Sequence, residues 1–440
     1  MRVLALDVGS SSTRACAYDE RGRALDECAS RKYSARTDRD GSAELDPDEL
    51  VQAAEAVLAE AGDADALGIS CFWHSLLLLD DREQPLTPVL AWQDRRAAAQ
   101  AEALAARLDQ TAVHDRTGCM LHPSYWPAKL AWLAEQGSLA RARHAVSFAD
   151  YLFLRLTGEL RTTLSTASGS GLLNLRTQSW DGELLDELGV AEALLPPISD
   201  EPAGTSYPPL GDGACSNLGC GCVTPDRAAL TIGTSGAYRV VHGGDPTPRE
   251  GLFAYLLDER RVIEGGSISD GGNLLAWLDR TLESGDQKSG EPDAHGLTFL
   301  PLLGGERSPG WNPRATGAIA GLTFGATPAE LRQAALEGVA YRVAEIAERL
   351  AVVREVVATG GALREDEWWL QVFADALALP VVASGVEEGS ARGAAVHVLE
   401  RLGVEPEPAP LGETYEPHPD RTAIFAAARK RQRALYDELF

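Results

Sequence analysis

The sequence predicts an α/β protein built from two similar halves. The first observation is an apolar run at residues 3–8, broken only by Asp7, which is followed by Gly9, a group of hydroxyl residues and a second apolar run from Ala15. The second is that residues 229–240 repeat this pattern, with Thr231 where Asp7 stands. The third is a strand–helix–strand step after the first copy. A pattern that recurs once near the start of each half indicates a duplicated fold.

Each copy is typical of a β-hairpin whose turn could surround an anionic oxygen. Gly9 and Gly233 let the backbone N–H groups approach such an oxygen closely, and the neighbouring hydroxyls could donate to it. Asp7, at the end of the first strand, could hold a water of a Mg²⁺ bound to the same anion. An ordinary polar turn has the same composition. The repetition favours phosphate binding, with a nucleotide between the halves.

The composition is that of a globular protein and argues against several classes of partner. The 440 residues are 45% hydrophobic and 24% charged, a length that allows two or three domains. The net charge is −25, which argues against binding to nucleic acid or to an anionic membrane surface. The chain begins directly with a strand, without a signal-peptide pattern, and has no run of about 18 apolar residues. We therefore predict a cytoplasmic protein with no nucleic-acid or membrane partner.

The cysteines give a related expectation. Seven are scattered over the chain, which is typical of reduced cytosolic thiols. Cys215, Cys220 and Cys222 lie close together, but no CxxC pair or nearby histidine accompanies them. We therefore expect reduced thiols and no structural zinc.

In the first half, a helix and a strand follow the hairpin. Asp46 is a candidate N-cap and Pro47 the first residue of a helix that runs to about residue 62. Residues 66–71 form the next strand, and a further strand begins at residue 88. Ligands of open α/β sheets bind beyond the carboxyl ends of strands. The residues that follow the first of these strands, 72–75, are therefore well placed to touch a substrate.

A proline-rich connector at 196–209 leads to the second half, which starts at about residue 226. Residues 284–293 are predicted to form a polar surface loop. Thr327 and Glu330 predict a capping box for a helix whose apolar stripe continues to Leu350 and indicates core packing. A strand enters a glycine turn at 360–362, the tail at 405–419 is expected to be loosely packed, and a helix is expected at 421–439.

Taken in this order, the residues resemble the FGGY family of carbohydrate kinases, within the larger group that includes sugar hexokinases, actin and the heat-shock 70 chaperones. The most specific segments are GGERSPGWNP at 304–313 and GAIAGLTFGATPAELRQAALEGVAY at 317–341. The resemblance implies duplicated actin-like ATPase (ribonuclease H-like) domains with a cleft between them. It also implies an N-terminal sugar-binding domain at 1–223, a C-terminal nucleotide-binding domain at 224–440, and ATP-dependent phosphorylation of a sugar hydroxyl.

The resemblance also assigns roles to residues. Asp212, in a Gly-Asp-Gly sequence, stands where the family has the base that removes a proton from the substrate hydroxyl. The lead-in at 207–210 is shorter than the family's apolar strand, and Asp-Gly is also a common turn pair. Asp7 is assigned to Mg²⁺. The candidates for binding the phosphates and adenosine of ATP are Gly9, Ser11, Ser12, Thr13, Gly233, Thr234, Ser235, Gly360, Gly361 and Ala362. The candidates for binding the sugar are His74, Ser75, Trp92, Gln93, Asp94 and Arg95.

Three segments indicate which branch of the family, and so which substrate, applies here. They look most like the gluconokinase branch: His74-Ser75, His122-Pro123 and residues 211–213. A gluconate carboxylate requires a cation, which Arg95 or Arg96 could supply, although Arg96 is better interpreted as a solvated helix start. We predict conversion of gluconate to 6-phosphogluconate with ATP and Mg²⁺. A kinase of another sugar acid, a pentulose such as xylulose, or a polyol is the alternative. A non-catalytic sugar or nucleotide sensor on the same fold is another. The oligomeric state stays open, a homodimer included.

Overall fold

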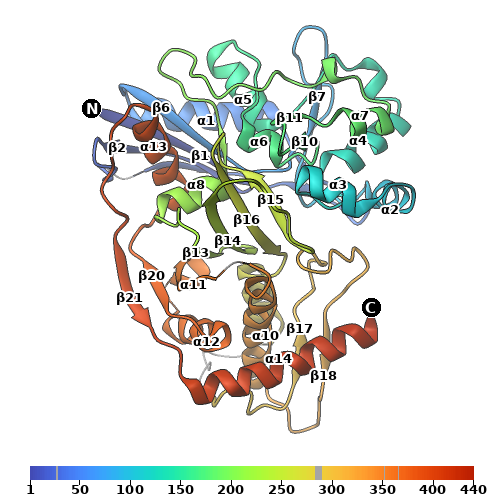
Figure 1. Ribbon diagram of the computed structural model, residues 1–440, viewed down its shortest axis with the longest axis vertical. Helices are drawn as coiled ribbons and strands as arrows, with labels where there is room; N and C mark the ends of the chain where they lie inside the picture. Colours follow the sequence, from blue (N-terminus) through green and yellow to red (C-terminus); the bar gives the residue numbers. More distant parts are fainter. Residues whose placement is uncertain (26–27, 283–289, 351, 365) are drawn as a thin grey trace.

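The computed structural model describes residues 1–440 except 26–27, 283–289, 351 and 365. Most of the predicted polar loop at 284–293 therefore lies outside the described residues. Two mixed sheets form the centre of the molecule (Figure 1). The first sheet has the strand order β12 (Leu210–Gly211), β6 (Ala66–Cys71), β1 (Arg2–Val8), β2 (Ser12–Asp19), β3 (Ala29–Lys32). The second has the order β15 (Phe253–Leu256), β16 (Arg261–Ile268), β14 (Gly236–Gly243), β13 (Arg227–Ile232), β19 (Glu355–Thr359), β20 (Val381–Ser384), β21 (Leu411–Tyr415).

Smaller sheets and helices surround these two. The smaller sheets are β4 (Arg36–Thr37) with β5 (Ala43–Leu45) and β8 (Val89–Leu90); β7 (Leu77–Leu79) with β9 (His144–Val146); β10 (Leu173–Asn174) with β11 (Ser179–Trp180); and β17 (Thr298–Leu300) with β18 (Ala318–Ala320). The helices of the first half are α1 (Pro47–Ala61), α2 (Ala98–Arg107), α3 (Gln110–Thr117), α4 (Trp126–Glu135), η1 (Leu139–Arg141), α5 (Phe148–Thr157), α6 (Leu164–Ser168), α7 (Gly182–Leu188), η2 (Glu192–Leu194) and α8 (Asp212–Gly219). Those of the second are α9 (Gly272–Thr281), α10 (Pro328–Ala347), α11 (Gly361–Arg364), α12 (Glu367–Leu377), α13 (Gly389–Arg401) and α14 (Pro419–Leu439).

The two sheets repeat one arrangement, as the sequence predicts. β1 pairs antiparallel with β2 and parallel with β6, and β13 pairs antiparallel with β14 and parallel with β19. The matched residues Asp7 and Thr231 both stand one residue before the end of the incoming strand. Both hairpins are therefore correctly predicted, and their incoming strands end at Val8 and Ile232, directly before the two turn glycines. The outgoing strand β2 is longer than the predicted apolar run, since it begins at Ser12 and ends at Asp19.

The predicted helix starts are confirmed. The Asp46 side chain accepts from the N–H groups of Asp48 and Glu49 at the start of α1. Thr327 and Glu330 form the predicted capping box of α10, which is buried along most of its length against the second sheet and α12. Side chains of α10 belong to the largest apolar core cluster, together with those of β13, β19 and α12.

Close packing of two helices joins the first sheet to the second half of the chain. α13 packs against α8, β6 and β1 (Figure 1). A Cβ at Gly219 of α8 would overlap the carbonyl of Gly389, and one at Gly393 would overlap that of Cys215. Because only glycine allows this approach, these residues fix α8 closely against α13. We keep 1–223 and 224–440 as proposed domain limits, noting that α13 packs on the first sheet.

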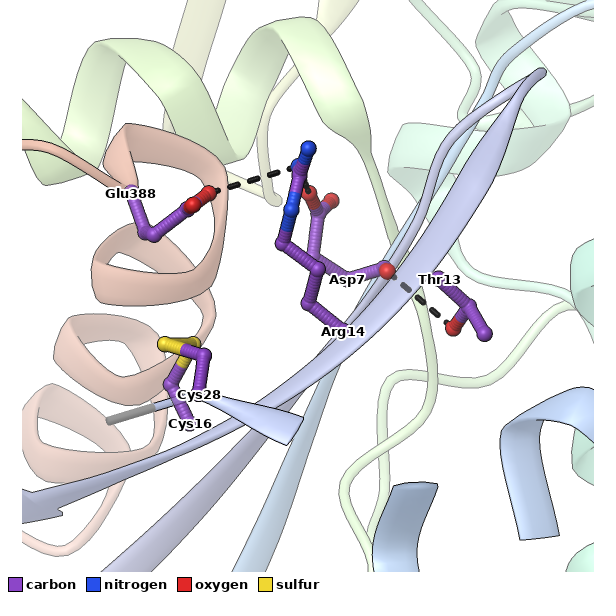
Figure 2. The surroundings of a disulfide bond; sticks show 6 residues. All are labelled: Asp7, Thr13, Arg14, Cys16, Cys28 and Glu388. Atoms are coloured by element: carbon purple, nitrogen blue, oxygen red, sulfur yellow. Dashed lines mark hydrogen bonds and ion pairs between the residues drawn. A yellow bond between two sulfur atoms is a disulfide. The ribbon is translucent and has the colours of Figure 1, made fainter. Parts of the chain in front are cut away.

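Two expectations are wrong. Residues 411–415, in the tail expected to be loose, form β21 and pair antiparallel with β20. Cys16 and Cys28, expected as thiols, form a disulfide (Figure 2). The register of β2 with β3 pairs Ala15 with Ala29, so these two cysteines stand opposite each other where the pairing continues. The other five cysteines are free and buried. In the described part of the chain, no helix is both long and apolar enough to cross a membrane.

Candidate active site

A cavity of about 320 Å³ lies between the two hairpin turns. Its lining comes from both halves of the chain, with the turn at 9–12 on one side and that at 233–236 on the other. Asp212, at the start of α8, also lines this cavity, as do Arg14 and Arg239 of the strands that leave the two turns. A larger hollow of about 960 Å³ lies elsewhere, between residues 18–28 and 385–410. It contains neither turn nor Asp212, so the smaller cavity is the candidate site.

The position of Asp212 is determined by the indole of Trp73. A Cβ at Gly211 or Gly213 would overlap this ring, so the Gly-Asp-Gly sequence lets the start of α8 lie flat against it. The N–H of Gly213 donates to Asp212 Oδ1 at 2.8 Å. Burial raises the pKa of Asp212, and the nearby Arg239 partly offsets the rise. A carboxylate with a raised pKa at the edge of a cavity is a suitable proton acceptor.

Asp7, drawn with its neighbours in Figure 2, is a buried carboxylate whose charge interacts with that of Asp212. Its Oδ1 accepts from Ser70 Oγ at 2.7 Å, and its Oδ2 lies 3.9 Å from Arg14 Nη1. Arg14 also pairs with Glu388 at 3.3 Å. Burial raises the pKa of Asp7 to about 6, and the charge of Asp212 adds to the rise. Asp7 and Asp212 together form an oxygen-rich, negative environment, which suits Mg²⁺.

His74 has a defined hydrogen-bonding role on the cavity wall. Its Nδ1 lies 2.6 Å from the carbonyl oxygen of Gly169, which can only accept, so Nδ1 carries the proton. Burial lowers its pKa to about 3, and the ring is therefore neutral with an accepting Nε2. The backbone of His74 has a φ of 67°, and Lys129 Nζ donates to its carbonyl at 2.6 Å. His74 can thus accept a hydrogen bond from a substrate hydroxyl.

Trp92 and Gln93 connect this cavity to a second one of about 240 Å³. Gln93 Oε1 is buried and has no hydrogen-bond partner among the described residues, so it is available to accept one from a ligand. His122 and Arg95 line the second cavity. Arg95 is exposed and donates from Nη2 to the carbonyl of Pro313 at 2.6 Å, which ties the two halves together at this edge.

The structure brings together most of the residues that the sequence singled out. Those lining the first cavity are Gly9, Ser11, Ser12, His74, Trp92, Gln93, Asp212, Gly233, Thr234 and Ser235. Gly360–Ala362 lies beside it, since Gly360 packs on the backbone of Ile232 and Ala362 lies against Gly272, which contacts Gly233.

Three other predicted residues are buried behind the wall. Thr13 Oγ1 donates to the carbonyl of Asp7 at 3.2 Å, and Ser75 Oγ accepts from the N–H of Phe148 at 3.0 Å. The carboxylate of Asp94 pairs with Arg96 and accepts from the N–H of Ala43 at 3.1 Å. Their polar groups are used within the protein, so their proposed contacts with ATP or sugar have no support in this geometry.

Arg96 also differs from its interpretation as a solvated residue. Its guanidinium pairs with Asp94 and with Glu44, each at 2.6 Å, and lies 4.6 Å from the centroid of the Trp132 ring. It is a partly buried structural cation, which the sequence did not indicate because Glu44 of β5 and Trp132 of α4 are far from it along the chain.

The sequence did not single out several cavity residues from the second half. Arg239, in β14, donates to Thr231 Oγ1 at 2.9 Å and to Asn217 Oδ1 at 3.0 Å. Tyr255 bonds to Tyr125 through their hydroxyls at 2.7 Å, and Arg307 lines both cavities. The sequence did contain an indication of Arg239, because an arginine within the apolar run of β14 is unusual: charged residues are rarely buried unless they are paired. Nothing local marked Tyr255.

Comparison with known proteins decides the family. Residues 2–210 match the N-terminal domain of the FGGY family of carbohydrate kinases, and residues 228–398 match its C-terminal domain. This chain belongs to the FGGY family of carbohydrate kinases. The predicted family and the predicted duplicated actin-like fold are thereby confirmed, and the protein is a carbohydrate kinase.

Relatives of this FGGY kinase carry different names. It is 29% identical to the gluconokinase of Bacillus licheniformis, over 91% of this chain and 88% of that protein. It is 34% identical to the glycerol kinase of Rhodospirillum centenum, over 91% of this chain and 90% of that protein. Its fold matches a gluconate kinase from Lactobacillus acidophilus with a TM-score of 0.91 at 27% identity, covering 100% of this chain and 98% of that one. A ligand-bound xylulose kinase from the same organism matches with a TM-score of 0.92 at 27% identity, covering 100% of this chain and 98% of that one.

Proposed function

We propose that this FGGY kinase transfers the γ-phosphoryl group of ATP to a hydroxyl of gluconate, giving 6-phosphogluconate. The observation that carries the proposal is Asp212, a carboxylate of raised pKa that shares one cavity with both hairpin turns and His74. The similarity to gluconokinases over most of both chains supports the choice of substrate.

In this proposal, Asp212 accepts the proton of the attacking hydroxyl. An alcohol is a poor nucleophile until it loses this proton, and a positioned base supplies about 10²- to 10⁴-fold in rate. His74 Nε2 and Gln93 Oε1 accept hydrogen bonds from other hydroxyls and orient the substrate. The apolar face of Trp92 packs against its C–H groups.

The hairpin turns bind the phosphates. Ser11, Ser12, Thr234 and Ser235 donate from hydroxyl or backbone groups, and Gly9 and Gly233 let the backbone approach. Asp7 would hold Mg²⁺, with Asp212 adding to the negative field, and the ion would neutralise charge on the phosphates. Gly360, Gly361 and Ala362 are proposed to line the adenosine. Closure of the two halves would exclude water as a competing acceptor.

The test is ATP consumption, measured by coupled ADP detection, with gluconate, other aldonates, xylulose, ribulose and glycerol. Asp212→Asn is compared with wild type and with Asp186→Asn, a matched change of an exposed carboxylate on α7. We expect turnover with gluconate that falls at least about 100-fold in Asp212→Asn, with ATP binding retained, and no change in Asp186→Asn. ATP binding without turnover of any sugar or sugar acid would favour the sensor alternative.

A neutral pentulose is the second candidate. The fold similarity to a xylulose kinase is as high as that to a gluconate kinase, and the uncharged His74 suits any polyhydroxy compound. Turnover of xylulose or ribulose without turnover of gluconate would establish this alternative.

A further inference from the structure

Arg307 is a partly buried cation that has no ion-pair partner among the described residues. Its guanidinium carbon lies 4.4 Å from the centroid of the Trp92 ring. Its Nη2 donates to the carbonyl of Ile268 at 3.0 Å, and its Nε is buried without a hydrogen-bond partner among the described residues. No carboxylate of the described residues lies within ion-pair distance of it, and burial lowers its pKa.

Among the described residues, Arg239 of the first cavity also lacks a carboxylate partner and donates to Thr231 and Asn217, whereas two other arginines are paired with carboxylates. Arg342 pairs with Glu306 and Glu345, and Arg96 pairs with Asp94 and Glu44. A buried charge without a partner is strongly unfavourable unless a ligand supplies the opposite charge. Because Arg307 lines both the first and the second cavity, an anionic group of a ligand could reach it.

The surroundings of Arg307 indicate which anionic group of a ligand would contact it. Its charge acts on His74, His122, Tyr125 and Tyr255, and helps to lower the pKa of both histidines. With Trp92, these form the wall proposed to face the sugar. The phosphate side has its own buried cation, since Arg239 reaches Thr231 beside the second hairpin turn. Because its charge also acts on Asp212, Arg307 lies where this wall meets the proposed base, within the cavity that would hold the substrate.

We propose that Arg307 binds the carboxylate of an aldonate and makes this kinase prefer sugar acids to neutral sugars. The inference rests on the proposed function. It assigns the substrate carboxylate to Arg307 instead of to Arg95 or Arg96. Arg95 is tied to the carbonyl of Pro313 at the exposed edge, and Arg96 is paired with Asp94 and Glu44. The planar guanidinium of Arg307, held against Trp92, suits a carboxylate in a two-point contact.

The test compares gluconate with gluconamide, in which the carboxylate is a neutral amide of similar shape. We expect the wild type to prefer gluconate in kcat/KM, and Arg307→Met to lower kcat/KM for gluconate by about 100-fold while changing that for gluconamide less than about threefold. Calorimetry of gluconate binding without nucleotide provides the same comparison if gluconamide turns over too slowly. Arg307→Lys, which keeps the charge, should retain part of the preference. Arg314→Met, an exposed arginine of the same segment, should behave as wild type.

Three results would overturn the inference. Equal losses with gluconate and gluconamide, or weaker ATP binding, would place Arg307 at the transferred phosphoryl group. An unchanged kcat/KM for gluconate in a folded Arg307→Met would also contradict it. Thermal melts show whether each variant is folded, and Arg307→Lys keeps the test valid if Arg307→Met is not. If wild type turns over a neutral sugar but not gluconate, the proposed function fails first, and calorimetry with other sugar acids then tests Arg307 separately.

Discussion

The two hairpins share a backbone plan but differ in charge. In both, an arginine of the outgoing strand reaches the matched residue of the incoming strand. Arg14 Nη1 lies 3.9 Å from the carboxylate of Asp7, and Arg239 Nη2 donates to the hydroxyl of Thr231 at 2.9 Å. The first hairpin thus carries a carboxylate with a raised pKa, and the second carries a hydroxyl that also bonds to Thr359 at 2.8 Å. Repeated backbone geometry does not imply repeated chemistry.

The largest expected effect separates the two matched residues. Asp7→Asn should lower kcat by about 100-fold or more, because it removes a negative charge proposed to hold Mg²⁺ beside the phosphates. Thr231→Val, of the same shape, should lower kcat less than tenfold, since it removes hydrogen bonds with Arg239 and Thr359 but no charge. Steady-state kinetics with varied Mg²⁺ measure both. Similar losses in the two variants would show that the hairpins act alike.

The same comparison predicts that stability depends on pH through Asp7, since Thr231 has no titratable side chain. The pKa of Asp7 is about 6 in the folded protein against an ordinary 3.8, so the folded state holds this proton more tightly than the unfolded chain. Ionisation of Asp7 therefore lowers the free energy of unfolding as pH rises from 3.8 to about 6, by about 3 kcal/mol at about 1.4 kcal/mol per pKa unit. Asp7→Asn should be more stable than wild type above this range and equal to it below. Urea unfolding at both ends checks this, and a constant difference would contradict it.

The disulfide is a further difference, since the second hairpin has no counterpart among the described residues. Cys28→Ser should lower the free energy of unfolding by about 3 kcal/mol, because the bond closes a short loop of separation 12. Activity should be nearly unchanged, since neither sulfur lines the cavity between the turns. Denaturant curves with and without a reductant provide the measurement, and reductant should not affect the variant. A matching fall in kcat would mean that the bond also positions Arg14, two residues from Cys16.

The smallest effects concern the glycines of the two turns. A Cβ at Gly233 meets nothing within 4 Å, while one at Gly9 would lie 3.3 Å from the carbonyl of Ser12. Gly233→Ala should stabilise the protein by about 0.4–1 kcal/mol by restricting the unfolded chain, and Gly9→Ala should not. If the proposed contact with phosphate is correct, Gly233→Ala should still raise KM for ATP. An unchanged KM would argue that the phosphate does not approach this residue.

Much of the fold was predictable because its signals are local. The hairpins follow from apolar runs broken at Gly9 and Gly233, and α10 follows from a capping box and an apolar stripe. The register of β20 with β21 was not predictable, because residues 411–415 are polar and mostly exposed and their pairing depends on a distant edge strand. The disulfide was missed for a similar reason, since β3 has little strand character of its own.

The sequence by itself determined the duplicated α/β plan, the family resemblance and a set of candidate residues, because these depend on short-range periodicity and on motif order. The tertiary structure decided which candidates share a cavity. It showed that His74 and Gln93 line it while Ser75 and Asp94, their neighbours, point into the protein. It also brought in Arg239 and Arg307 from the other half of the chain. Which charges are left unpaired depends on contacts between residues far apart in the sequence, and only folding establishes those contacts.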